Sequence, residues 1–138
     1  MKDIKEILFI IQARLQSERV PNKMLRAFNN SSLFEIAINK VLSSNIIPKN
    51  NFYVSVYEED LRNVALQYDL NIFNRSYDSA MNDNDLKTIY EWHNKLDYKY
   101  VIKINGCSPF LKVETIDGFV EKFINQDEEN LFGVIETK

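Results

Sequence analysis

The chain has 138 residues, a formal net charge of −3, 45% hydrophobic and 27% charged residues, the balance of a soluble globular protein with one domain. Its pI of about 5.2 argues against a general nucleic-acid binder, which would present an extended basic face, and no apolar run approaches the roughly 20 residues that cross a bilayer. Cys107 is the only cysteine, which excludes an intrachain disulfide framework.

The first predicted element is a buried strand of a parallel sheet, because Ile7–Gln12 is a short and uninterrupted apolar run. No small-residue cleavage site follows this run, so we interpret it as a strand and not as a signal peptide, and we expect a cytoplasmic protein. Next, Ser31 or Ser32 can cap a helix, with Glu35 three or four residues further on.

The rest of the chain alternates between the two periodicities. Strands are predicted at 52–57, 71–73 and 100–104, with a last apolar run at 131–135. Helices are predicted at 33–42, 60–68, 85–96 and 113–124, the last with Ile116, Val120 and Phe123 facing inward. This alternation predicts one α/β domain over residues 1–138, with three α/β/α layers around a mostly parallel, Rossmann-like sheet.

Two segments follow strands and contain few apolar residues. They are residues 13–23, after the first strand, and residues 105–110, NGCSPF, after the strand at 100–104. Parallel α/β sheets bind ligands beyond the carboxyl ends of their strands. We therefore expect both segments to lie at the same edge of the sheet and to border one ligand site.

The glycines exclude two familiar nucleotide motifs. The chain has only Gly106, Gly118 and Gly133, so neither the GxGxxG dinucleotide fingerprint nor the GxxxxGK[ST] phosphate loop is present. A phosphate site in this chain must depend on side chains and on backbone N–H groups outside a glycine-rich turn.

Residues 12–26 form a basic segment in an acidic chain. Its four cations are Arg14, Arg19, Lys23 and Arg26, and its one acid is Glu18, so four minus one gives a local charge of +3 against −3 for the whole chain. Arginine can hold a phosphate bidentately and lysine supplies a mobile point charge. The segment is therefore either an anion site or a solvated loop whose cations face water.

The order of residues in the basic segment resembles the signature ARxxSxRxPxKxL of the cytidylyltransferases. This family includes the synthetases that load CMP onto sialic acid and onto 3-deoxy-manno-octulosonate (KDO), and related spore-coat polysaccharide proteins. The matching residues are Ala13, Arg14, Ser17, Arg19, Pro21, Lys23 and Leu25. The resemblance implies a fold of the nucleotide-diphospho-sugar transferase type. It also implies that Ala13, Arg14, Ser17, Arg19 and Lys23 wrap the CTP phosphates, with Arg14 and Lys23 as catalytic residues.

Two weaker matches extend the resemblance along the chain. Arg75, in Asn74-Arg75, resembles an arginine-containing loop near the nucleotide in the family. The segment YVIKINGCSPFL resembles the family's run into a turn near the nucleotide, which implies a nucleotide-binding role for Asn105, Gly106, Ser108 and Pro109. Cys107 occupies the position where the KDO-type branch has a magnesium-binding aspartate, and a thiol is a poor ligand for magnesium.

The resemblance implies transfer of CMP from CTP to a sugar acid, with Mg²⁺, for surface polysaccharide biosynthesis. The chain stops at Lys138, about where those enzymes begin their sugar-binding and dimer-forming half. It is therefore expected to be an N-terminal nucleotide-binding portion, truncated or shortened, and a homodimer is an open expectation. The alternative function is a non-catalytic nucleotide-binding or assembly module.

Other residues allow minority interpretations. A nucleophilic Cys107 paired with His93 is less favoured than a small buried cysteine and a structural histidine. The motif Asp83-Asn84-Asp85 has the letters of a glycosyltransferase metal pair, but it precedes a predicted helix, where capping is the simpler role. Trp92 and Tyr90 could stack on a base, although aromatic residues at helical spacing more often belong to a core.

Overall fold

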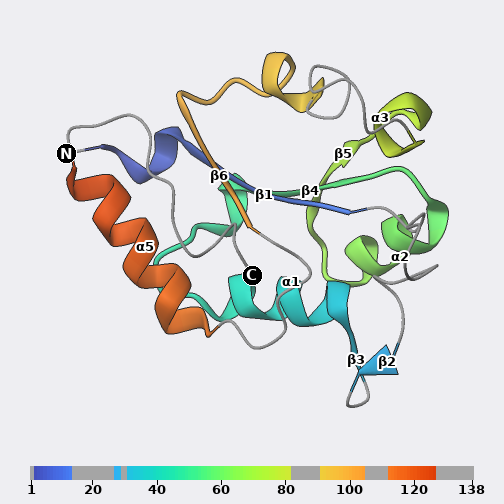
Figure 1. Cartoon of the computed structure of the whole chain (residues 1–138), viewed down its shortest axis with the longest axis horizontal. Helices are drawn as coiled ribbons and strands as arrows, with labels where there is room; N and C mark the ends of the chain where they lie inside the picture. Colours follow the sequence, from blue (N-terminus) through green and yellow to red (C-terminus); the bar gives the residue numbers. More distant parts are fainter. Residues whose placement is uncertain (1, 14–26, 29–30, 82–90, 105–111, 127–138) are drawn as a thin grey trace.

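The computed structural model describes residues 2–13, 27–28, 31–81, 91–104 and 112–126. Four strands in this part of the chain form an all-parallel sheet in the order β5-β4-β1-β6 (Figure 1). The strands are β1 (Ile7–Gln12), β4 (Phe52–Val56), β5 (Asn71–Asn74) and β6 (Tyr100–Lys103). The structure therefore confirms the predicted α/β fold with a parallel sheet, and β1 has the predicted bounds.

The central strand β1 is buried because it is paired on both sides. It pairs with β4 in the register Phe9↔Phe52 and with β6 in the register Phe9↔Ile102. Five of its six residues, Ile7 to Ile11, are buried, as expected for a parallel strand that is covered on both faces. The apolar run in the sequence is thus explained by its place in the middle of the sheet.

Three helices cover one face of the sheet. They are α1 (Leu33–Ser43), α2 (Glu59–Gln67) and α5 (Val113–Asn125), which Figure 1 shows together on one side of the strands. The largest core cluster joins their inward residues, such as Phe34 of α1, to alternating strand residues such as Phe9 and Phe52. In α5 the predicted inward residues are the buried ones: Ile116, Val120 and Phe123.

The opposite face is covered by the segment that includes the 3₁₀ helix η4 (Glu91–Asn94). Trp92, of which 4% is exposed, packs there with Leu8 and Ile10. Leu96, Tyr98 and partly buried strand residues complete this smaller cluster. The sheet is thus the middle layer of the domain, as the alternating pattern predicts.

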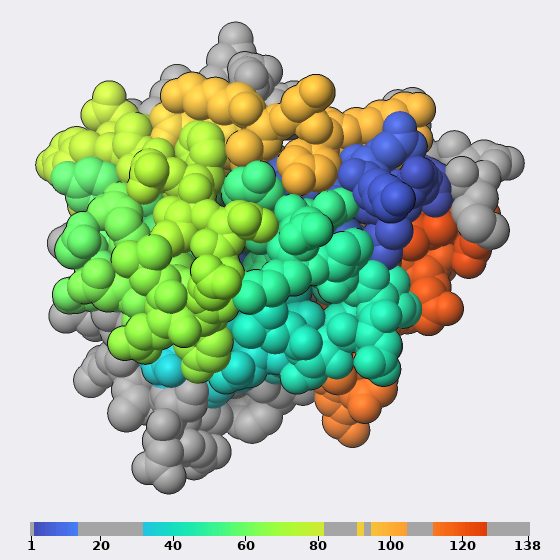
Figure 2. Space-filling model, turned by 180° about the vertical axis from the view of Figure 1, so that it is seen from behind, coloured from blue at the N-terminus to red at the C-terminus, as the bar shows by residue number. Residues whose placement is uncertain are grey.

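Side chains cap one end of α1 and one end of α5. Ser32 caps α1 by accepting a hydrogen bond from the backbone N–H of Glu35 at 3.1 Å, as the sequence predicts. Lys2 is buried, and its Nζ donates to the carbonyl oxygens of Phe123 and Gln126 at the end of α5. Figure 2 shows the amino-terminal segment (blue) beside this helix (red). A cation at a helix carboxyl terminus is stabilising because it complements the unpaired carbonyls.

Some elements differ from their predicted form. The short helix α3 (Tyr77–Met81) was not predicted; in its first turn Ser76 Oγ accepts a hydrogen bond from the N–H of Ser79. Of the predicted helix at 85–96 the structure describes residues 91–96. Glu91–Asn94 form a 3₁₀ helix, and the N–H groups of Lys95 and Leu96 then both donate to Trp92 O.

Smaller differences lie at element ends. Two short strands, β2 (Ala27–Phe28) and β3 (Ser31–Ser32), pair antiparallel before α1 and were not predicted. The 3₁₀ helices η1 (Ile4–Glu6) and η3 (Lys49–Asn51) precede β1 and β4. The apolar run at 131–135 lies outside the described residues. None of the helices in the described ranges is long and apolar enough to cross a membrane.

Candidate functional site

The candidate site is the carboxyl edge of the sheet, where β1 ends between its two neighbours. Beyond β1, the N–H of Ala13 donates to Ser55 O of β4 at 3.0 Å. Beyond β6, the N–H of Ile104 donates to Ile10 O of β1 at 2.9 Å. The two segments that the sequence singled out therefore start at neighbouring strand ends, on the same edge of the sheet, as expected.

The structure describes two of the predicted site residues, Ala13 and Arg75, and it brings them into contact. Arg75 Nη1 donates to Ala13 O at 3.0 Å. The other predicted nucleotide-binding residues lie outside the described ranges: Arg14, Ser17, Arg19, Lys23, Asn105, Gly106, Ser108 and Pro109. Cys107, Asp83 and Asp85 also lie outside them. Their roles stay predictions.

Arg75 is a buried arginine, with 6% of its surface exposed. Besides Ala13, it contacts Ser79 of α3 twice: Nε donates to Ser79 Oγ at 2.8 Å and Nη2 donates to Ser79 O at 2.7 Å. Its backbone N–H donates to Val56 O at 2.8 Å, one residue beyond the acceptor of Ala13 on β4. A guanidinium is planar and carries N–H donors on two edges, so it can bind Ser79 and Ala13 at the same time.

A second set of polar contacts connects the same edge to η4. Trp92 Nε1 donates to Gln12 Oε1 at 2.7 Å, and Ser76 N–H donates to Glu91 Oε1 at 2.6 Å. Sequence reasoning assigned no role to Gln12, Ser76 or Glu91. The one signal for Gln12 was its place as the polar end of an apolar run.

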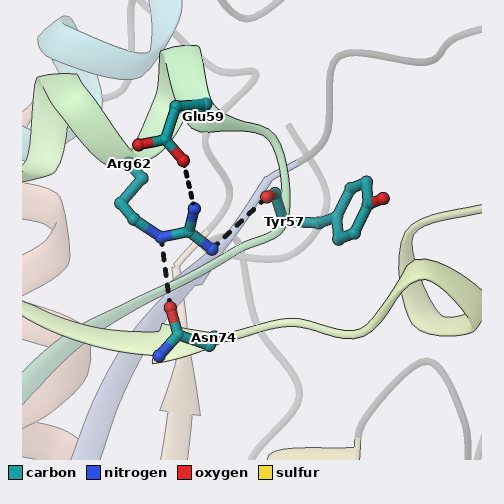
Figure 3. Close-up of polar contacts among 4 residues, drawn as sticks. All are labelled: Tyr57, Glu59, Arg62 and Asn74. Atoms are coloured by element: carbon teal, nitrogen blue, oxygen red, sulfur yellow. Dashed lines mark hydrogen bonds and ion pairs between the residues drawn. The ribbon is translucent and has the colours of Figure 1, made fainter.

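A further arginine, Arg62 of α2, spans the ends of β4 and β5 (Figure 3). Its Nε donates to Asn74 Oδ1 at 3.1 Å and its Nη2 donates to Tyr57 O at 3.4 Å. Its Nη1 forms an ion pair with Glu59 at 2.6 Å. The side chain is 27% exposed and touches neither Ala13 nor α3 in any of these contacts, so it stabilises only the outer part of the edge.

The described residues show no metal centre at this edge. Within the described ranges, no three His, Cys, Asp or Glu residues lie close enough together to hold a metal ion. Burial lowers the pKa of Lys40, and burial followed by the neighbouring Tyr53 raises the pKa of Tyr98. Lys40 is in the last turn of α1 and Tyr98 precedes β6, so both lie toward the amino edge of the sheet.

The fold is that of known nucleotidyltransferases. The structure resembles CMP:2-keto-3-deoxy-manno-octonic acid synthetase complexed with CTP, with a TM-score of 0.70 and 13% identity over 85% of this chain and 46% of the other. It also resembles a cytidylyltransferase from Leptospira borgpetersenii serovar Hardjo-bovis, with a TM-score of 0.68 and 19% identity over 88% of this chain and 50% of the other. These similarities define the class of fold.

The sequence comparison is more specific. The family model described as cytidylyltransferase matches residues 8–137, and the chain therefore belongs to the cytidylyltransferase family. It is 24% identical over 132 residues to the spore coat polysaccharide biosynthesis protein SpsF of Bacillus subtilis, covering 91% of this chain and 53% of that protein. The chain thus spans about half the length of this curated relative.

Proposed function

We propose that this chain is the nucleotide-binding part of an enzyme that transfers CMP from CTP to a sugar acid, such as sialic acid or KDO, for surface polysaccharide biosynthesis. The observation that carries the proposal is the ordered motif from Ala13 to Leu25, directly after the central strand of a cytidylyltransferase-family chain. The carboxyl edge where the motif starts is the edge at which parallel α/β sheets bind ligands.

The reaction requires an oxygen nucleophile and a good leaving group. A hydroxyl oxygen of the sugar acid forms a bond to the α-phosphorus of CTP, the bond from this phosphorus to the bridging oxygen breaks, and pyrophosphate leaves with its electron pair. The hydroxyl proton passes to water or to a base. Charge builds on the phosphate oxygens during this step, so nearby cations lower its barrier.

In this proposal the cations of the basic segment act on the phosphates. Arg14 and Lys23 neutralise the developing charge, whereas Ser17 and Arg19 orient the triphosphate. Residues 105–109, which follow β6 at the same edge, border the base or the ribose. These roles come from the family resemblance together with the place where each segment leaves the sheet.

Magnesium is part of the proposal as an ion that CTP itself carries. Mg²⁺ keeps several waters and is usually held by substrate phosphates with one or two carboxylates, and it would add positive charge at the phosphates. The described residues offer no ready cluster of ligands. We therefore assign no protein ligand to the ion.

The sugar acid is proposed as the acceptor of CMP by analogy with the relatives. One structural neighbour is a synthetase for a keto-deoxy sugar acid, and a curated relative is a spore coat polysaccharide biosynthesis protein. The alternative function is a nucleotide-binding module without turnover. It is favoured by Cys107, which by resemblance stands where the KDO-type branch has a magnesium-binding aspartate.

Nucleotide selectivity tests the binding part of the proposal. In calorimetric titrations with Mg²⁺, we expect CTP to bind at least about tenfold more tightly than UTP, ATP or GTP. UTP presents an oxygen where CTP presents an amino group, and a site built to hydrogen-bond one rejects the other. Purine bases are larger than cytosine. Equal affinities for the four nucleotides, or no binding of any, would contradict the assignment.

A further inference from the structure

We propose that Arg75 is a positioning residue. It fixes the start of the basic segment, directly after β1, by donating a hydrogen bond to the carbonyl oxygen of Ala13. In the family resemblance this arginine belongs to a loop near the nucleotide. The geometry instead points to an indirect role, in which Arg75 acts on the ligand through the backbone that carries Arg14. This inference rests on the proposed function, because it concerns how the same site is organised.

The first observation is the set of acceptors around the guanidinium. Arg75 uses one edge, Nε and Nη2, for the two oxygens of Ser79, at 2.8 and 2.7 Å. It uses Nη1 for Ala13 O at 3.0 Å. These three contacts hold the plane of the guanidinium between α3 and the end of β1. A lysine ammonium has no such fork and cannot reach both sides in this fixed geometry.

The second observation is that both ends of this contact are anchored on β4. Ala13 N–H donates to Ser55 O and Arg75 N–H donates to Val56 O, two consecutive carbonyls at the end of that strand. The peptide carbonyl that Arg75 holds is the one that joins Ala13 to Arg14. Its orientation therefore influences the direction in which the chain leaves the sheet toward the first cation of the motif.

The third observation is that Ser79 is itself held in place. It is fully buried, and its N–H donates to Ser76 Oγ at 3.1 Å. Ser76 N–H in turn donates to Glu91 Oε1. The residue after Glu91, Trp92, donates to Gln12, the residue before Ala13. The contacts thus form a closed ring that joins the end of β1, α3 and η4.

A ring of this kind can contribute to binding without touching the ligand. Ordering a segment when a ligand binds costs free energy. This cost is smaller when the first residues of the segment are already held in the bound orientation. The expected result of breaking the ring is a weaker affinity for CTP, by roughly 5- to 30-fold, as expected for losing one or two buried hydrogen bonds.

The test uses Arg75→Lys, which retains the charge, and Ser79→Ala, which removes only the hydroxyl acceptor. Both are expected to weaken CTP binding, and the double variant is expected to be no weaker than the stronger single variant, because both changes break one unit. The matched control is Arg62→Lys, which disturbs the other three-contact arginine at this edge (Figure 3). It should leave the affinity within about twofold of the wild type.

A second measurement needs no nucleotide. Amide hydrogen exchange at Ala13, whose N–H is bonded to Ser55 O, should become faster in Arg75→Lys and in Ser79→Ala, but not in Arg62→Lys. Circular dichroism melting shows whether each variant is folded, and Ser79→Ala is the milder change if Arg75→Lys loses stability.

Two results would overturn the inference. One is a Ser79→Ala variant with wild-type CTP affinity beside an Arg75→Lys variant that binds CTP much more weakly, because this pattern indicates direct contact between Arg75 and the nucleotide. The other is unchanged exchange at Ala13 in both variants. A different outcome separates the two claims. If exchange at Ala13 becomes faster in both variants but the wild-type protein binds no nucleotide, the positioning contact is supported and the proposed function is contradicted.

Discussion

Replacing Arg14 by alanine is expected to weaken CTP binding by roughly 30- to 150-fold, which corresponds to about 2–3 kcal/mol for a lost charge-assisted hydrogen bond to phosphate. Arg14 is the first cation of the motif and follows Ala13, whose N–H and carbonyl oxygen are both bonded at the carboxyl edge. Calorimetric titration of the variant with CTP and Mg²⁺ measures the loss.

The matched control for this prediction is Arg26→Ala. It removes the same charge from the same segment, but Arg26 lies outside the set of residues that the resemblance assigns to the phosphates. A purely long-range effect of one exposed charge is small, about 1 kcal/mol or less. If Arg14→Ala and Arg26→Ala weaken CTP binding equally, the basic segment acts only by its total charge and the motif carries no specific contact.

Replacing Phe9 by alanine is expected to lower the free energy of unfolding by about 3–5 kcal/mol. Phe9 is fully buried in the middle of β1 and stands opposite Phe52 on one side and Ile102 on the other. The cavity would therefore open where three strands meet. Urea denaturation measures the change directly, and the melting temperature should fall by roughly 10–17 °C for a domain of this size.

The control for this second prediction is Leu66→Ala on α2, a leucine that is 59% exposed. This substitution should change the free energy of unfolding by no more than about 0.5 kcal/mol, because surface substitutions away from special features change stability little. Equal losses for the two variants would contradict the assignment of β1 to the centre of the core. Since β1 also ends at the candidate site, a partly unfolded Phe9→Ala protein should lose its nucleotide affinity as well.

The sequence predicted those features of the fold that depend on local patterns. The apolar run of β1 indicated a buried strand because burial on both faces requires apolar residues at successive positions. The cap, predicted at Ser31 or Ser32 and found at Ser32, and the inward face of α5 were also predicted, since capping and helical periodicity act within a few residues. The alternation of elements then indicated a parallel sheet, and the structure confirms it.

The features that were missed depend on distant contacts. The helix α3 is only five residues long, too short for a periodic pattern, and the serine before it is held by Glu91, fifteen positions away. Within the predicted helix at 85–96, residues Glu91–Asn94 form a 3₁₀ helix before the chain turns back toward the sheet. Local propensity contains no information about either constraint.

The candidate site shows the same division. The motif of the basic segment could be recognised from the sequence because its residues are close together in the chain. The contact between Arg75 and Ala13 joins residues 62 positions apart, and no local pattern reports it. The pairing of Gln12 with Trp92 spans 80 positions. Only the folded chain shows that Arg75 holds the strand end from which the motif begins.

The most direct test of the central claim is the release of pyrophosphate. The chain is incubated with CTP, Mg²⁺ and a sugar acid, sialic acid or KDO, and pyrophosphate is measured over time beside reactions that lack one component. We expect release that requires CTP, a sugar acid and Mg²⁺ together and that is lost in Arg14→Ala. Tight binding of CTP without release of pyrophosphate in the presence of either sugar acid would contradict the proposed transfer and favour a nucleotide-binding module without turnover.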